Sequence, residues 1–166
     1  MGYAFKMARI TTATTADDLD LARELWREYA RVVDEPAWFP GFESELAELG
    51  KMYGPPDGTF LLAWEGSELA ACGSLRRLDA DTAELRRVYV RPKFRGRGLA
   101  RTISMALMGE ARALGYSLVR LDIPPKLAEG LKLYQSLSFR QIPPYAAQPP
   151  GAICMEARVR SGPRPK

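Results

Sequence analysis

The sequence predicts a mixed α/β domain (α+β class) with a largely antiparallel sheet. Segments with the apolar spacing of helices alternate with short strand-like segments, and three strand candidates follow one another closely between Thr59 and Val90. Strands joined by short turns pair antiparallel, whereas a doubly wound parallel sheet needs a helix after each strand. The 166 residues contain neither an internal repeat nor a low-complexity linker. This length suits one domain, so we expect residues 1–166 to form a single domain.

The first third of the chain is expected to hold one short strand, residues 8–12, and two helices. The first helix begins near Thr15 or Asp17, since both residue types cap helices, and stops at Pro36. Its apolar residues recur every three or four positions, as on one helix face: Leu21, Leu25, Trp26, Tyr29, Val32 and Val33. A second, shorter amphipathic helix is expected over residues 42–49.

The remaining elements follow from strand periodicity and turn residues. Strands are expected over residues 59–64, 68–78, 83–90, 117–123, 139–142 and 152–159, and helices over residues 98–114 and 126–137. Glu65-Gly66-Ser67 marks a hairpin between the first two of these strands. A proline-rich loop containing Tyr145 joins the last two. Residues 161–166 read as a frayed tail.

Composition excludes several classes of site. The chain has no histidine, which removes His-dependent triads and most catalytic zinc sites. Its two cysteines, Cys72 and Cys154, have neither metal-ligand spacing nor the pattern of a disulfide framework. No apolar run reaches the ~18 residues of a membrane span, and the N-terminus lacks a secretory signal. We therefore expect a soluble, cytoplasmic protein without a metal. Met7 would serve as well as Met1 as a start.

Positive charge is concentrated in one short segment. The net charge is +4, yet seven positive residues and no acid lie within sixteen positions: Arg86, Arg87, Arg91, Lys93, Arg95, Arg97 and Arg101. Removing these seven from the net charge leaves −3 for the rest of the chain. Nucleic-acid binders usually spread positive charge over a wide face, so this pattern better suits a compact polyanion such as a nucleotide phosphate cluster. A solvated arginine-rich loop is the alternative.

Two glycines in this segment indicate a phosphate cradle. A strand ending at Val90 leads through Gly96 and Gly98 into the helix expected at residues 98–114. The first helical turn leaves N–H groups unpaired, and glycine lets an anion approach them. The P-loop pattern does not occur, and the dinucleotide pattern G-x-G-x-x-G fails because Arg101 replaces its third glycine.

The segment instead resembles the GNAT superfamily of N-acetyltransferases. Arg95-Gly96-Arg97-Gly98-Leu99-Ala100 fits the acetyl-coenzyme A signature [QR]-x-x-G-x-[GA]. Downstream, the Leu-Tyr…Leu…Phe frame around Tyr134 matches a second family pattern, and the resemblance covers residues 83–139. Three positions depart from the pattern: Leu127 replaces an asparagine, Gly130 an alanine and Ser138 a glycine.

The resemblance implies a mixed, mostly antiparallel sheet of six or seven strands flanked by about four helices. It further implies acetyl-coenzyme A as co-substrate. The residues expected to bind it are Val88, Tyr89, Val90, Arg95, Gly96, Arg97, Gly98, Leu99, Ala100 and Arg101. Tyr134 becomes the acid that protonates the departing thiolate; an ordinary half-buried helix tyrosine is the alternative. For the base that deprotonates the amine, the resemblance favours Glu84, with Asp122 or a water chain as alternatives. If Glu84 has no catalytic role, we expect a solvated strand carboxylate that pairs with Arg86 or with a neighbouring strand.

The expected function is transfer of an acetyl group to a primary amine by direct attack in a ternary complex. A small-molecule acceptor is preferred, with a peptide or protein N-terminus as the alternative. A coenzyme A-binding module without catalysis is the rival from another class, and nucleic-acid binding is third. The acceptor pocket is expected among Trp38, Phe39, Phe42, Tyr53 and Tyr145. We expect no nucleic acid and no membrane as partners, and the oligomeric state, a homodimer included, stays open.

Overall fold

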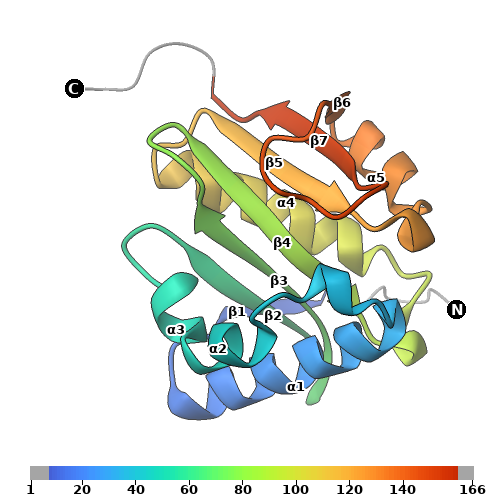
Figure 1. Cartoon of the computed structure of the whole chain (residues 1–166). Coiled ribbons are helices and arrows are strands. Elements are labelled where there is room, and N and C mark those ends of the chain that lie inside the picture. Colours follow the sequence, from blue (N-terminus) through green and yellow to red (C-terminus); the bar gives the residue numbers. More distant parts are fainter. Residues whose placement is uncertain (1–7, 161–166) are drawn as a thin grey trace, which may run out of the picture.

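A seven-stranded sheet runs through residues 8–160, the part of the chain that the computed structural model describes (Figure 1). The strands are β1 (Arg9–Thr12), β2 (Thr59–Glu65), β3 (Glu68–Arg77), β4 (Thr82–Val90), β5 (Leu118–Ile123), β6 (Arg140–Ile142) and β7 (Ile153–Arg158). Their order in the sheet is β1-β2-β3-β4-β5-β7-β6. Only the β4–β5 pair is parallel among these neighbours. The prediction of a mixed, mostly antiparallel sheet is confirmed.

The α-helices are α1 (Ala16–Val33), α2 (Phe42–Ala47), α3 (Leu49–Met52), α4 (Leu99–Ala113) and α5 (Gly130–Ser136). Short 3-10 turns cover Pro36–Trp38, Pro92–Phe94 and Pro125–Leu127. The start of α1 is as predicted, because Thr15 and Asp18 form a capping box in which each side chain accepts from the other's backbone N–H.

Two predicted helices are interrupted in the structure. The helix expected over residues 42–49 breaks at Glu48, whose φ and ψ of −95° and 12° separate α2 from α3. The helix expected over residues 126–137 starts as a 3-10 turn, and α5 begins only at Gly130. Gly130, a poor helix former, lies where α5 begins after this turn. The predicted tail, residues 161–166, lies outside the described residues.

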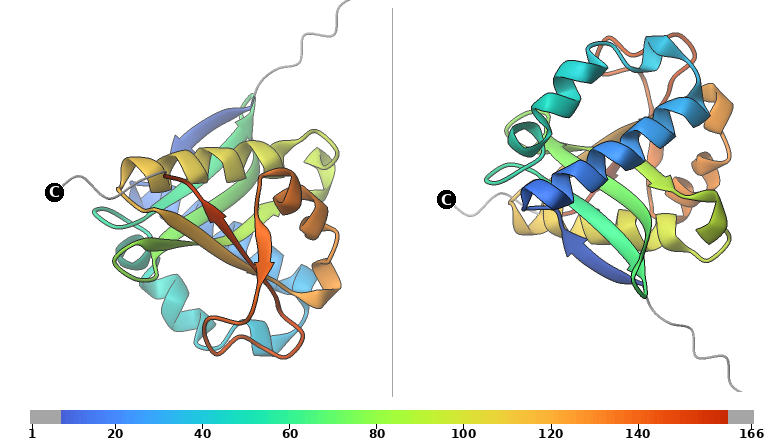
Figure 2. Two further views of the ribbon diagram at one scale, coloured as in Figure 1. Left: turned by 90° about the horizontal axis from the view of Figure 1, so that it is seen from above. Right: turned by 90° about the horizontal axis from the view of Figure 1, so that it is seen from below.

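The helices form two layers, one on each face of the sheet (Figure 2). Alternate residues of β2 point to opposite faces: Phe60 and Leu62 pack in the core with α1, α2 and α3, while Leu61 and Ala63 pack in the core with α4 and α5. Among residues 8–160, no helix is long and apolar enough to cross a membrane.

A β-bulge between β3 and β4 shapes the centre of the sheet. Ser74 pairs with Arg86 and Cys72 with Tyr89, so two residues of β4 lie opposite Gly73 alone. The first of these, Arg87, has a φ of +52°. A Cβ on Gly73 would lie 2.5 Å from the Ile103 Cγ2 atom of α4, so only glycine permits the observed packing of α4 against the bulge.

Strands β4 and β5 stay paired for three residues only. Their parallel ladder joins Thr82, Ala83 and Glu84 to Leu118, Val119 and Arg120, and the pairing ends there. Bulges bend a strand, and beyond Glu84 the strand β4 runs on through its bulge without pairing with β5. The two strands therefore diverge, and the site described next lies where they part.

Candidate active site

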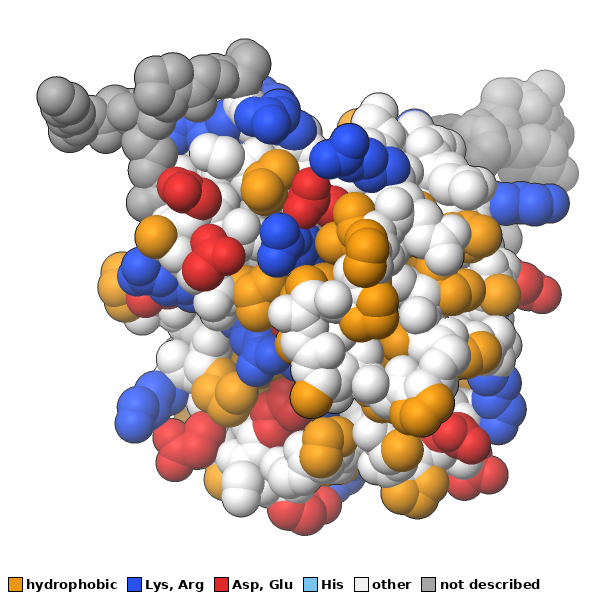
Figure 3. Space-filling model, turned by 45° about the horizontal axis from the view of Figure 1, so that its top comes forward, with side chains coloured by type: hydrophobic (Ala, Val, Ile, Leu, Met, Phe, Trp, Pro, Cys, Tyr) orange, Lys and Arg blue, Asp and Glu red, His pale blue; other side chains and the backbone are white. Residues whose placement is uncertain are grey.

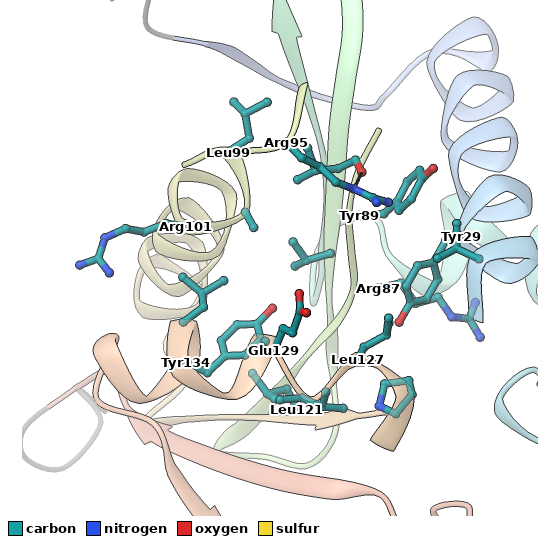
Figure 4. A pocket seen from close by; sticks show the side chains of 18 of the residues that line it. Tyr29, Arg87, Tyr89, Arg95, Leu99, Arg101, Leu121, Leu127, Glu129 and Tyr134 are labelled. Atoms are coloured by element: carbon teal, nitrogen blue, oxygen red, sulfur yellow. Dashed lines mark hydrogen bonds between the residues drawn. The ribbon is translucent and has the colours of Figure 1, made fainter. Parts of the chain in front are cut away.

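A cavity of about 540 Å³ lies between the diverging ends of β4 and β5 (Figure 4). Its walls come from both strands, from the turn before α4 and from α5. Nine of the ten predicted co-substrate residues line it: Val88, Tyr89, Val90, Arg95, Gly96, Gly98, Leu99, Ala100 and Arg101. The tenth, Arg97, is not among the lining residues, and its guanidinium forms an ion pair with Glu65 of β2. The turn and both strands thus meet around one space, although they are far apart in sequence.

The N-terminus of α4 opens into this cavity with an accessible backbone. Gly96 and Gly98 have φ values of +77° and +75°, and nothing lies within 4 Å of the position where either would carry a Cβ. No side chain caps this helix within the described residues. Free N–H groups and the positive end of the helix dipole together favour an anion there. The segment predicted as a phosphate cradle is therefore an open helix end, and phosphate binding there stays a prediction.

The seven positive residues of the basic segment divide into two groups. Five form ion pairs with acids: Arg86 with Glu84, Arg87 with Glu45, Arg91 with Glu24 and Glu28, Lys93 with Glu68, and Arg97 with Glu65. Arg95 and Arg101 have no acidic partner in the described residues, and both line the cavity. Acidic, basic and apolar side chains are also interspersed over the face in Figure 3. The two arginines of this segment without an acidic partner thus both lie near the start of α4, although the guanidinium of Arg101 points away from the cavity and donates to Ser136 (Figure 4).

Tyr134 lies on α5 at the opposite side of the cavity from Arg87 (Figure 4). Its side chain is 8% exposed, and its ring packs edge-on against Phe139 with centroids 5.5 Å apart. Burial raises the pKa of Tyr134 to about 12, and an interaction with the Ser104 side chain offsets part of this rise. The phenol is therefore protonated at neutral pH and can donate a hydrogen bond or a proton into the cavity.

A second cavity of about 180 Å³ adjoins the first. The two share the lining residues Tyr29, Arg87, Asp122 and Pro124. The second cavity extends from this junction past Arg76, Glu84 and Arg86, under the loop at residues 146–149 and against Trp38 and Phe39. The two cavities therefore meet at these four residues.

Glu84 is buried and fully engaged by its neighbours. Arg76 Nη2 and Arg86 Nη1 lie 2.9 and 3.1 Å from its Oε1 atom, and the Tyr145 hydroxyl donates to Oε2 at 2.6 Å. Burial raises the pKa of Glu84, but Arg86, the hydrogen bond from Tyr145 and Arg76 outweigh it and hold the pKa below its usual range. This carboxylate is a weak proton acceptor and a strong structural anchor for the Tyr145 loop.

Asp122, from β5, has the opposite environment. Its carboxylate has no hydrogen-bond or ion-pair partner among residues 8–160, and it lines both cavities. Burial raises the pKa of Asp122, and the nearby negative charge of Glu84 raises it further, while the surrounding arginines oppose the rise. The pKa of Asp122 is thus shifted in the direction opposite to that of Glu84, toward a better proton acceptor.

Arg87 is a site residue that sequence reasoning assigned no role. The bulge turns its side chain, 5% exposed, toward the α1 face, where Nη1 lies 2.9 Å from Glu45. Its guanidinium carbon lies 4.5 Å from the ring centroid of Trp26, with Phe39 at 5.0 Å. A bulge and a positive φ in a non-glycine residue have no sequence signature, so the composition alone could not reveal this placement.

The predicted acceptor aromatics divide between cavity and core. Trp38 and Phe39 line the second cavity. Tyr53 is 1% exposed in the core and donates to Glu45, and Phe42 packs against the same core. The thiol of Cys72 is buried, and burial raises its pKa, so it stays protonated and unreactive.

Comparison with known proteins assigns the family. The model of the acetyltransferase (GNAT) family matches residues 19–139, which is well over half of the chain. The protein belongs to the GNAT acetyltransferase family. An uncharacterized N-acetyltransferase of Schizosaccharomyces pombe is 30% identical over 153 residues, covering 90% of this chain and 94% of the relative.

Solved GNAT structures share the fold. A GNAT-family acetyltransferase of Staphylococcus aureus superposes with a TM-score of 0.78 over 93% of this chain and all of that one, at 14% identity. The Salmonella typhimurium protein YncA, solved with its cofactor acetyl-coenzyme A, has a TM-score of 0.71 over 97% of this chain and 99% of that one, at 21% identity. The GNAT assignment thus rests on sequence and fold together.

Proposed function

We propose that this GNAT protein transfers an acetyl group from acetyl-coenzyme A to the primary amine of a small molecule. The observation that carries the proposal is the pair of joined cavities: one begins at an open, cationic helix end and contains a protonated tyrosine, and the other contains a free carboxylate. The YncA structure with acetyl-coenzyme A supports the choice of donor.

The donor would bind in the larger cavity. The N–H groups at the start of α4, with Arg95 and Arg101, suit its pyrophosphate, since they offer hydrogen-bond donors and uncompensated positive charge. The gap between β4 and β5 suits its pantetheine arm. Backbone groups of residues 88–90, on the wall of this gap, are the proposed donors to the acetyl carbonyl.

The two proposed proton carriers have suitable environments. Asp122 takes one proton from the acceptor ammonium, and the resulting amine forms a C–N bond with the acetyl carbon as the C–S bond breaks. Tyr134 donates its phenolic proton to the leaving sulfur and regains one from the nitrogen as the amide forms. The proton on Asp122 then returns to solvent, which balances the reaction. Glu84 remains the alternative base, although the arginines around it make its carboxylate less basic.

A small acceptor fits better than a peptide. The second cavity has room for about six waters at ~30 Å³ each and is bounded by residues 146–149 of the loop before β7. The hydrogen bond between Tyr145 and Glu84 fixes this loop against β4. We expect this loop to hinder a protein N-terminus more than a free amine of a few heavy atoms.

The donor site can be tested by thermal melting with 1 mM acetyl-coenzyme A against NAD and ATP. A dissociation constant of ~10 μM would stabilise the fold by about 2.7 kcal/mol, or roughly 5–10 °C. Gly98→Ala should reduce this shift, and Gly66→Ala is the matched control. Gly66 lies in the β2–β3 hairpin with a φ of +60° and open space around it, so both variants carry similar backbone strain. Equal shifts in wild type and Gly98→Ala would refute the assigned cradle, and thiol release with an amine panel tests turnover.

A further inference from the structure

The second cavity holds an excess of guanidinium groups. Arg76, Arg86 and Arg87 line it, against the carboxylates of Glu84 and Asp122. Arginine is the side chain best suited to bind a carboxylate, because its planar fork can donate two parallel hydrogen bonds. A cavity meant for an amine alone has no need of three arginines on its walls.

The ion pairs in this cavity leave donors unused. Arg76 and Arg86 both converge on one oxygen, Oε1 of Glu84, while Tyr145 occupies Oε2. Arg86 reaches Glu84 through Nη1 alone, and its other nitrogens have no hydrogen-bond partner in the described residues. Its side chain is 22% exposed. Since a guanidinium has five N–H donors, most of the Arg86 donors remain available on the cavity wall.

Arg87 supplies a second unsatisfied donor behind the first. Its side chain is 95% buried, and within residues 8–160 its Nη2 atom has no hydrogen-bond partner. Glu45 compensates its charge from the other side, at Nη1. An unpaired buried donor is unfavourable, so an unpartnered guanidinium nitrogen beside this wall favours an acceptor nearby.

We propose that the acceptor is an amino acid, with its carboxylate bound by Arg86 and supported by Arg87, and its amine at Asp122. This inference rests on the proposed function and specifies its acceptor class. Asp122 lies at the junction with the donor cavity, where an attacking nitrogen belongs, and Arg86 lines only the second cavity. A zwitterion pairs with both the free carboxylate and the free guanidinium donors. A simple amine would satisfy Asp122 and leave the remaining donors of Arg86 unused.

Matched acceptors test the inference on the wild-type protein. Thiol release is measured for each L-amino acid, its primary amide and its decarboxylated amine, all with acetyl-coenzyme A. The acids should exceed their amides and amines in kcat/KM by at least about tenfold, because hydrogen bonds to charged groups contribute about 1.5–3 kcal/mol. The preferred side chain is read from the same panel.

The variant Arg86→Gln assigns the residue. It should raise KM for the acid by tenfold or more while leaving the amide and the amine within about twofold, so the preference for the acid is lost. The control is Arg77→Gln. Arg77 lies at the end of the neighbouring strand β3, its side chain is exposed, and it pairs at 3.8 Å with Asp57 outside both cavities. This variant should keep the preference for the acid. Melting with acetyl-coenzyme A confirms that both variants are folded.

The outcomes separate the two proposals. A wild type that acetylates amines and amides as well as acids overturns the amino-acid inference and leaves the acetyltransferase intact. Selectivity that survives Arg86→Gln overturns the role of Arg86. Binding of acetyl-coenzyme A without thiol release for any member of the panel also overturns the inference. Absence of acetyl-coenzyme A binding overturns the proposed function and the inference with it.

Discussion

Replacing Glu84 with glutamine should destabilise the fold strongly at neutral pH. Glu84 is 4% exposed and holds Arg76, Arg86 and Tyr145 together, so the variant keeps the shape and removes the charge that two arginines share. Removing one partner of a buried ion pair costs about 3–5 kcal/mol. The two arginine side chains are 29% and 22% exposed, so water screens their charges. We therefore expect a smaller loss of stability, about 2–3 kcal/mol.

The effect should depend on pH in a definite direction. The folded-state pKa of Glu84 lies below the ordinary glutamate value of about 4.3. A depressed carboxyl pKa stabilises the fold above the unfolded-state pKa, and this stabilisation is lost as the pH falls through the folded-state pKa. The difference between wild type and Glu84→Gln should therefore be full at pH 7 and shrink below about pH 4.

Urea unfolding at pH 7 and pH 3.5 measures this difference, and a melting point lowered by about 4–12 °C at pH 7 is the corresponding thermal shift. The control is Glu68→Gln, which breaks the ion pair with Lys93 at an exposed site and should cost less than about 1 kcal/mol. A Glu84→Gln variant no less stable than Glu68→Gln at pH 7 would refute the reasoning. So would a stability loss that is equal at both pH values.

Three further predictions address the site and its support. Tyr134→Phe should lower kcat by about 10²-fold with acetyl-coenzyme A binding retained. The control is Tyr116→Phe, which removes a hydroxyl that donates to the Asp57 carbonyl and should leave kcat unchanged. An unaffected rate in Tyr134→Phe would remove the role of Tyr134 as acid. Asp122→Asn should abolish the acidic limb of the pH–rate profile. The same variant should stabilise the fold at pH 7 by about 0.5–2 kcal/mol, because a carboxyl group with a raised pKa costs stability once it is ionised. Urea unfolding measures the stability, and a destabilised variant would contradict the environment described for Asp122. Gly73→Ala should destabilise the fold by about 1–3 kcal/mol through overpacking against α4. The control is Gly109→Ala, in open space on α4 itself, which should stabilise the fold by up to about 1 kcal/mol. Urea unfolding compares the two variants, and equal effects would show that the bulge tolerates a side chain.

Local spacing predicted which residues around the start of α4 line the larger cavity. Gly96 and Gly98 follow a strand and open a helix, and backbone geometry at that point depends on only a few neighbouring residues. Tyr134 was predicted from its resemblance to a family frame, and it does line the same cavity. Its role as the acid, like that of Glu84 as the base, stays a prediction.

The acceptor side depends on long-range contacts that no local pattern encodes. The sequence shows seven clustered positive charges but not their partners, which come from α1, α2 and the β2–β3 hairpin. Pairing of Glu84 with Arg76 requires the β3–β4 register, whereas Arg86 lies two residues along the same strand and was considered as a partner from the sequence. The breaks in the two shorter helices were missed for a similar reason, since apolar periodicity continues across them.

The bulge opposite Gly73 connects the two cavities physically. It places the extra residue of β4 at Arg87, and the parallel pairing of β4 with β5 ends three residues earlier, at Glu84. The same irregularity thus lies beside the opening of the larger cavity and turns a guanidinium toward the second cavity. A regular β4 would keep its ladder with β5 and send the side chain at position 87 to the other face. Because Gly73 packs closely against Ile103 at this bulge, we expect a substitution at Gly73 to disturb both cavities, and with them the proposed acetyl-coenzyme A binding and acceptor selectivity together.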